Sequence, residues 1–265
     1  MIGARTTGRA AVLSPFSQGE VWSTAAIFFG DNALLAGLSA ETRALLKPHL
    51  AREKLTRRRV LVAAGAPTEF IYFPEGGVAS IVAVARDETG GTEIGIFGRE
   101  GMSATHLVLG VDRSPHETFI QMDGSTAVRI SAPRLVEALD ASAELRRTLL
   151  RFVQVMMVQS GQSSASNARA QIEARLARWL LMCHDRADGD ELRLTHEFMA
   201  MMIGAQRSGV TLALHLLESL GAISSLRGRV IVLDRPKLQD LAGDTYGPAE
   251  AEYRRLIGPF GKSPG

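Results

Sequence analysis

The sequence is poor in cysteine, since its 265 residues include only Cys183. A single thiol cannot form a disulfide within the chain, complete a four-thiolate zinc site or ligate an iron–sulfur cluster. We therefore expect no iron–sulfur cofactor. Because no framework of disulfides can form, we also expect a reducing compartment.

A long hydrophobic run is also missing. The apolar stretch from Val21 to Gly30 stops at Asp31, well short of the ~20 residues that a membrane-spanning helix requires. Nearer the start, Pro15 and Glu20 interrupt an apolar segment before a secretion signal is complete. These absences predict a soluble, cytoplasmic protein without a membrane partner.

The sequence has little excess of either positive or negative charge, and it lacks the common enzyme motifs. With 30 Lys and Arg against 28 Asp and Glu the net charge is +2, so any nucleic-acid affinity must come from local clusters. The sequence has no P-loop, nucleophile elbow or paired metal-ligand histidines. We expect no catalytic residue, no enzymatic activity and no metal site.

The residue pattern changes several times along the chain, and the length predicts two domains of modest size. Residues 1–30 mix Gly, Ser, Pro and Thr and indicate a loosely ordered extension. Helical spacing between Leu34 and Leu50 follows. Short β-branched runs separated by turn residues then predict an antiparallel barrel or sandwich; they are residues 60–62, 70–73, 78–84, 94–97, 118–121 and 126–130.

From Pro133 the pattern becomes helical. Residues at alternating spacings of four and three mark one face, beginning with Leu145, Leu149, Phe152 and Met156. This spacing is typical of a coiled-coil seam and also of an amphipathic helix that faces its own core. The position between two domains favours the seam, so we assign these four residues to dimerisation.

A second helical pattern starts at Ile172, and a pair of short helices follows it. Thr195 is suited to cap the first helix of the pair, and Gly204 stands where the chain must turn with positive φ. An inner apolar stripe on the second helix leaves its N-terminal end free, which is the end that a helix-turn-helix inserts into the DNA major groove.

A strand–turn–strand pattern follows this pair and has the form of a wing. Arg227-Gly228-Arg229 separates two apolar segments, and arginines at such a tip suit contact with phosphates. The candidate DNA-binding residues are Thr195, Gln206, Arg207, Ser208, Thr211, Leu212, Arg227 and Arg229.

The order of these parts resembles the Crp/Fnr family of bacterial transcription regulators, from about residue 32 to about residue 245. The helix pair Thr195–Leu217 and the segments Phe70–Gly77 and Gly98–Met102 carry the resemblance. It implies an α+β fold with an N-terminal antiparallel β-roll of the double-stranded β-helix or jelly-roll type. The implied divisions are a β-roll sensor domain of the cyclic-nucleotide-binding type (31–132), a dimerisation helix (133–167), a winged helix-turn-helix (168–245) and a tail without an assigned role (246–265).

The resemblance also implies partners and base contacts. A homodimer would bind a two-fold symmetric double-stranded operator, and RNA polymerase is left open as a further partner. Arg207 matches the first base-contacting arginine of the family. Ser208 stands where a glutamate often contacts cytosine, and Leu212 where a second arginine often lies, so the operator should differ from the best-known consensus.

The ligand residues of the sensor domain depart further from the family. By resemblance the candidates are Glu100, Arg113, Ser114 and Ser160, but Arg113-Ser114 lies two residues early for the phosphate-binding Arg-Ser pair. This departure argues against cyclic-nucleotide binding. The isolated histidines of this half argue against haem, and the effector stays unknown.

A different class of function is also compatible with the pattern. Helix pairs with a glycine turn occur in modules that contact proteins instead of DNA, with the β-roll as a ligand-free scaffold. Arg207 distinguishes the two hypotheses, because only a base-contacting arginine gives sequence-selective binding.

Overall fold

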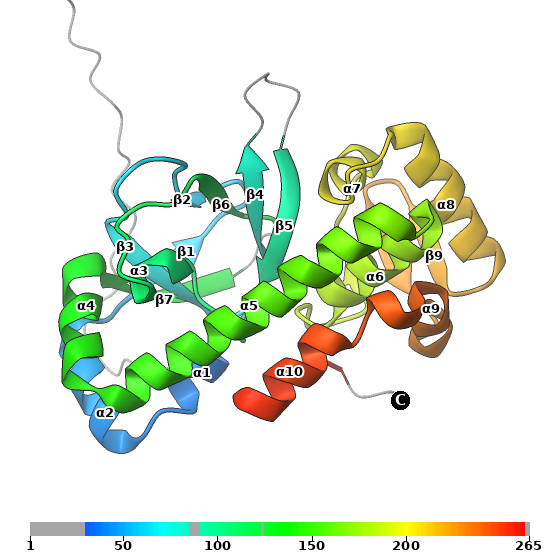
Figure 1. The fold of residues 1–265 in the computed structure, drawn as a ribbon. Helices are drawn as coiled ribbons and strands as arrows, with labels where there is room; N and C mark the ends of the chain where they lie inside the picture. The colour runs from blue at the N-terminus through cyan, green and yellow to red at the C-terminus, as the bar shows by residue number, and fades with distance from the viewer. Residues whose placement is uncertain (1–29, 85–90, 123–124, 263–265) are drawn as a thin grey trace, which may run out of the picture.

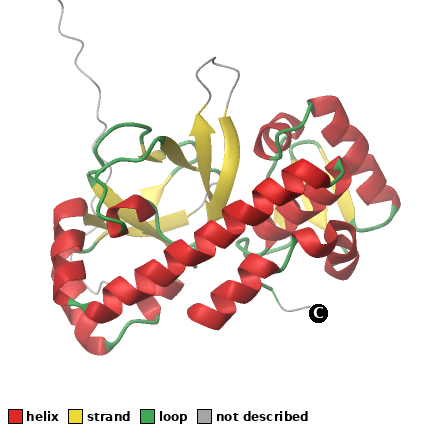
Figure 2. Cartoon of the chain, in the orientation of Figure 1, coloured by secondary structure: helices red, strands yellow, loops and turns green. Residues whose placement is uncertain are grey.

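The computed structural model describes residues 30–84, 91–122 and 125–262. Except for Gly30, the extension predicted at residues 1–30 lies outside this part of the chain. The fold is α+β, as predicted, with strands in the N-terminal half, one long helix and a mostly helical C-terminal part (Figure 1, Figure 2).

Two antiparallel sheets form the β-roll, in the orders β1-β7-β3 and β2-β6-β4-β5. Apolar β-branched residues pair across the first sheet, where Ile71 lies opposite Ile130, and both side chains are buried. The strands are β1 (Ala51–Leu55), β2 (Val60–Val62), β3 (Phe70–Pro74), β4 (Ala79–Val84), β5 (Gly91–Phe97), β6 (His116–Ile120) and β7 (Ser125–Ser131). Strand β1 is an addition to the sequence prediction.

Short helices close the ends of the β-roll. Buried Asn32 fixes the entry of the chain, because its side-chain amide donates to the carbonyls of Pro74 (2.9 Å) and Gly101 (2.8 Å). These helices are α1 (Ala33–Ala36), α2 (Ala40–Leu46), the 3₁₀ turn η1 (Lys47–His49), α3 (Thr105–Val108) and α4 (Ala132–Ala141).

The long helix α5 (Ala143–Arg169) has 27 residues and runs from the β-roll to the C-terminal domain (Figure 1). A break at Ser142 separates it from α4, because the Ser142 hydroxyl accepts the backbone N–H of Leu145 and caps a new helix. Leu145, Leu149 and Phe152 are at most 1% exposed in the single chain and pack in the β-roll core.

The C-terminal domain is a helical unit with a small three-stranded sheet of order β8-β10-β9. It shares a core with the β-roll, since Val82 and Ile96 of the β-roll pack with Leu180 and its neighbours. Its elements are α6 (Ile172–His184), β8 (Glu191–Leu192), α7 (His196–Met202), α8 (Arg207–Ser219), β9 (Ile223–Leu226), β10 (Arg229–Val232) and α9 (Arg235–Ala242).

The tail forms a 3₁₀ turn η2 (Gly243–Thr245) and helix α10 (Pro248–Leu256), which lies along α5. Tyr253 of α10 is buried, and its hydroxyl donates to the carbonyl of Glu100 at 2.9 Å. The segment without an assigned role in the sequence thus packs on both α5 and the β-roll. Within the described residues, no helix combines the length and the apolar character needed to cross a bilayer.

Candidate nucleic-acid interface

The helix pair α7–α8 is built as its sequence pattern predicts. The Thr195 side chain accepts the backbone N–H of Phe198 at 3.2 Å and caps α7, and Gly204 adopts φ +58° between the helices. Met199, Val210 and Leu214 are buried between the helices and the rest of the domain. This packing holds the N-terminal end of α8 at the surface.

The exposed end of α8 carries most of the predicted DNA-binding residues. Gln206, Arg207, Ser208 and Leu212 are exposed, and the Arg207 guanidinium lies 3.7 Å from the Glu197 carboxylate. Because 69% of the Arg207 side chain is accessible, this ion pair is weak and the guanidinium is free to exchange partners.

Thr211 differs from these residues because it is half-buried and already bonded. Its hydroxyl donates to the Arg207 carbonyl at 3.0 Å, and His196 Nδ1 lies 3.1 Å from the same oxygen. The hydroxyl therefore links the first residue of α7 to the first turn of α8. The sequence pattern did not predict this contact of His196.

The wing forms a hairpin whose turn needs a glycine. Gly228 adopts φ +75° between β9 and β10, and Arg227 and Arg229 are exposed at the tip. Arg229 lies 3.3 Å from Glu191 on β8, so β8, which the sequence did not predict, brings a negative charge beside the wing. Arg193, the fourth arginine of this surface, pairs with the same carboxylate at 3.5 Å.

The predicted ligand residues do not form a single pocket lining. Glu100 is 3% exposed, and its carboxylate accepts from Arg186 Nε at 2.8 Å and from the Gly98 backbone at 2.9 Å. Arg113 is exposed and pairs with Asp112. Ser114 and Ser160 are half-buried, on the loop before β6 and on α5. The cavity beside Glu100 measures about 10 Å³, room for roughly one water molecule.

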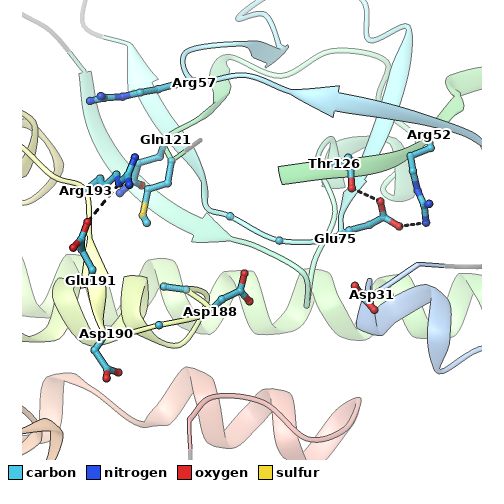
Figure 3. A pocket seen from close by; sticks show the side chains of 15 residues that line it. Asp31, Arg52, Arg57, Glu75, Gln121, Thr126, Asp188, Asp190, Glu191 and Arg193 are labelled. Atoms are coloured by element: carbon cyan, nitrogen blue, oxygen red, sulfur yellow. Dashed lines mark hydrogen bonds and ion pairs between the residues drawn. The ribbon is translucent and has the colours of Figure 1, made fainter. Parts of the chain in front are cut away.

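A larger cleft of about 890 Å³ lies between the β-roll and the α6–β8 loop (Figure 3). On one wall, polar groups of the lining are bonded to one another, since Glu75 accepts from Arg52 at 2.6 Å and from Thr126 at 2.5 Å. Arg193 and Glu191 pair on the opposite wall. The predicted ligand residues are not part of its lining.

The strongest polar contacts between the domains were missed by sequence reasoning. Arg186, just after α6, pairs with Glu100 of the β-roll with both side chains at most 4% exposed. Trp179 of α6 donates its indole N–H to Glu93 of β5 at 2.8 Å. The partners are 86 residues apart in each pair, so only the tertiary fold reveals them.

The possible metal ligands and the single cysteine complete the description of the candidate sites. They contain no group of three or more His, Cys, Asp or Glu side chains placed to hold a metal ion. Cys183 is buried, and burial raises the pKa of its thiol. A buried protonated thiol is unreactive.

Among known protein families, a match is found for the C-terminal part of the chain. Residues 174–241 match the Crp-like helix-turn-helix domain. Among curated proteins, none matches the chain in sequence.

Solved structures share the fold at low sequence identity. A transcriptional regulator from Eubacterium rectale assigned to the Crp/Fnr family is 16% identical, with a TM-score of 0.63 over 79% of this chain and 97% of that chain. The c-di-GMP-responsive global regulator CLP of Xanthomonas campestris is 18% identical, with a TM-score of 0.60 over 73% and 99%. A CRP-family regulator from Thermus thermophilus is 20% identical, with a TM-score of 0.60 over 73% and 96%.

The matched domain and the shared fold agree with each other along the chain. The matched residues include α7, α8 and the wing. The structural match extends over 96–99% of the length of each of the three solved regulators. Residues 174–241 are a Crp-like helix-turn-helix domain, and the chain shares its fold with transcription regulators of the Crp/Fnr family.

Proposed function

We propose that this regulator is a homodimer that recognises a two-fold symmetric DNA operator through α8 and the wing. The observation that carries the proposal is the exposed N-terminal end of α8, where the Arg207 side chain is 69% accessible and only weakly paired with Glu197. Helix-turn-helix proteins insert this end of the second helix into the major groove. A DNA target places the protein in the cytoplasm.

The roles of the contact residues follow from their exposure. Arg207 is suited to bind guanine through two hydrogen bonds, and Leu212, 70% exposed, suits a thymine methyl group. Ser208, Gln206 and Thr195 lie beside them at the helix ends. Arg227 and Arg229 would bind phosphates, which adds affinity without sequence preference.

We assign dimerisation to a face of α5 that is different from the predicted seam. Leu145, Leu149 and Phe152 are buried inside the single chain, and Met156 is partly buried against the same core, which argues against the seam that the spacing predicted. The opposite face carries seven exposed residues at alternating spacings of three and four, which is a second coiled-coil pattern; they are Arg147, Leu150, Gln154, Met157, Gly161, Ser164 and Ala168.

Met157 offers a direct test of this face, because 66% of it is exposed at the middle of the stripe. In a dimer, Met157→Arg would bury an unpaired guanidinium and should raise the dimer dissociation constant by at least about tenfold. Light scattering across a concentration series measures this change. Val136→Arg, at an exposed apolar position on α4, is the matched control and should leave the dimer intact. Equal behaviour of the two variants would place the interface elsewhere.

The β-roll would serve as the regulatory domain of this dimer. Glu100 is held by Arg186 instead of facing an open cavity, and this arrangement does not favour a cyclic nucleotide at the position that the resemblance implies. RNA polymerase is a further partner of a regulator that acts at promoters.

Selection of binding sites from a random duplex pool tests the proposal as a whole. The purified protein should enrich a two-fold symmetric motif with half-sites about one helical turn apart. Enrichment of an asymmetric motif would contradict the symmetric dimer. Absence of any enrichment, with and without added cyclic nucleotide, would contradict sequence-specific recognition and favour a protein-interaction module.

A further inference from the structure

Glu93 is a carboxyl group buried at the contact between the β-roll and the C-terminal domain. It lies on β5, is 7% exposed, and has a partner on each oxygen. Oε1 accepts the indole N–H of Trp179 from α6 at 2.8 Å. Oε2 lies 2.8 Å from the Ser80 hydroxyl of β4. The group thus joins two strands of the β-roll to the first helix of the C-terminal domain.

The hydrogen-bond chain around Ser80 brings no positive charge to Glu93. The Ser80 hydroxyl is 2.6 Å from Gln121 Oε1, and the amide nitrogen of Gln121 lies 3.6 Å from the Cys183 sulfur. A hydroxyl, an amide and a thiol are neutral groups. On this side Glu93 therefore has a hydrogen-bond partner but no ion-pair partner.

The charged surroundings of Glu93 do not outweigh its burial. Among the described residues, Arg178, Arg186 and the Cys183 thiol are the titratable or charged groups that face Glu93, all on α6 or just after it. The two arginines favour the carboxylate, but Arg186 is already paired with Glu100 and Arg178 donates to the Thr245 carbonyl at 2.8 Å. Burial is the larger effect and raises the pKa of Glu93 to about 8.

We propose that Glu93 is a protonated, pH-sensitive contact that docks α6, and with it the winged helix-turn-helix, on the β-roll. Loss of the proton places a charge without an ion-pair partner in the shared core. Docking of the two domains weakens as a result. This role of Glu93 does not depend on which DNA sequence α8 recognises.

The direction of the pH effect follows from linkage. In the unfolded chain a glutamate ionises near pH 4.3, whereas the folded chain keeps the proton of Glu93 up to about pH 8. Between these values the folded state binds the extra proton, so a rise in pH destabilises it, by up to about tenfold in the unfolding equilibrium per pH unit. Above about pH 8 the contribution of this group no longer changes.

Glu93→Gln is the variant that tests the proposal, because glutamine imitates the protonated carboxyl group. Its amide nitrogen can donate to Ser80 while its oxygen accepts from Trp179. Urea unfolding of full-length wild type and variant should give a ratio of unfolding constants that grows with pH between about 5 and 8 and then levels off. Thr92→Ala, at the exposed position before Glu93, is the control and should shift stability by the same amount at every pH. A ratio independent of pH would overturn the proposal.

Two spectroscopic measurements separate docking from global stability. In a Trp22→Phe background Trp179 is the only tryptophan. Its emission should move to longer wavelength between pH 7 and pH 9.5 in the protein that keeps Glu93, but not in the Glu93→Gln variant. The infrared difference spectrum of the two proteins at pH 7 should contain the C=O band of a protonated carboxyl group. Identical emission responses, or a carboxylate band in place of the protonated one, would contradict the proposed role.

Discussion

Replacement of Arg186 by methionine should lower the free energy of unfolding by about 3–5 kcal/mol, because it leaves the Glu100 carboxylate buried without its partner. The two side chains are 3% and 4% exposed and lie 2.8 Å apart. Arg186 also donates to the Met182 carbonyl at 2.7 Å and lies over the Phe260 ring. Urea unfolding followed by circular dichroism measures the loss.

A second substitution shows whether the unpaired charge causes the effect. Adding Glu100→Gln to Arg186→Met removes that charge and should restore part of the lost stability. The matched control is Arg134→Met, which breaks an ion pair between side chains that are 53% and 62% exposed and should change stability little. If the losses in the double variant simply added, the buried pair would not be the source of the destabilisation.

Replacement of Arg207 by alanine should weaken binding to the selected operator by about 1–3 kcal/mol, because two hydrogen bonds to one guanine are lost. Tolerance for other bases at that position should increase. Fluorescence anisotropy with the operator and with single-base variants measures both effects. The helix itself should persist, since Arg207 is exposed and its ion pair with Glu197 is weak.

Arg229→Ala is the comparison that separates base contact from phosphate contact. Arg229 is exposed at the tip of the wing, where in the proposed complex a guanidinium would face the DNA backbone. Its loss should weaken all duplexes about equally and reduce the salt dependence by about one phosphate contact. If Arg207→Ala produced the same uniform loss, Arg207 would not be a base-contacting residue.

Local signals determined the helix-turn-helix. Capping by Thr195, the positive φ of Gly204 and the turn at Gly228 depend on neighbours within a few residues, so the residue types alone predict them. The short strands of the β-roll were predicted for the same reason. Strand β8 is too short to have a pattern of its own, since it has two residues and forms because Leu192 pairs with Val230.

Spacing alone could not distinguish the buried face of α5 from its exposed face. Leu145 and Met157 lie on two opposite faces that both have alternating spacings of three and four. Spacing shows that a face is apolar, but not whether the surface that covers it belongs to the same chain. Leu145 is buried in the β-roll core, whereas Met157 is 66% exposed, so only the tertiary structure shows which face is covered by the same chain.

The sequence by itself determined the order of the parts, the helix pair with its wing, and the exposed Arg207 at the start of α8, because each depends on contacts between near neighbours. The tertiary structure alone decided the pairing of Arg186 with Glu100 and of Trp179 with Glu93. These partners lie 86 residues apart, and no local spacing marks them as neighbours. Burial then changes their chemistry, since a carboxyl group that water would ionise keeps its proton in a shared core.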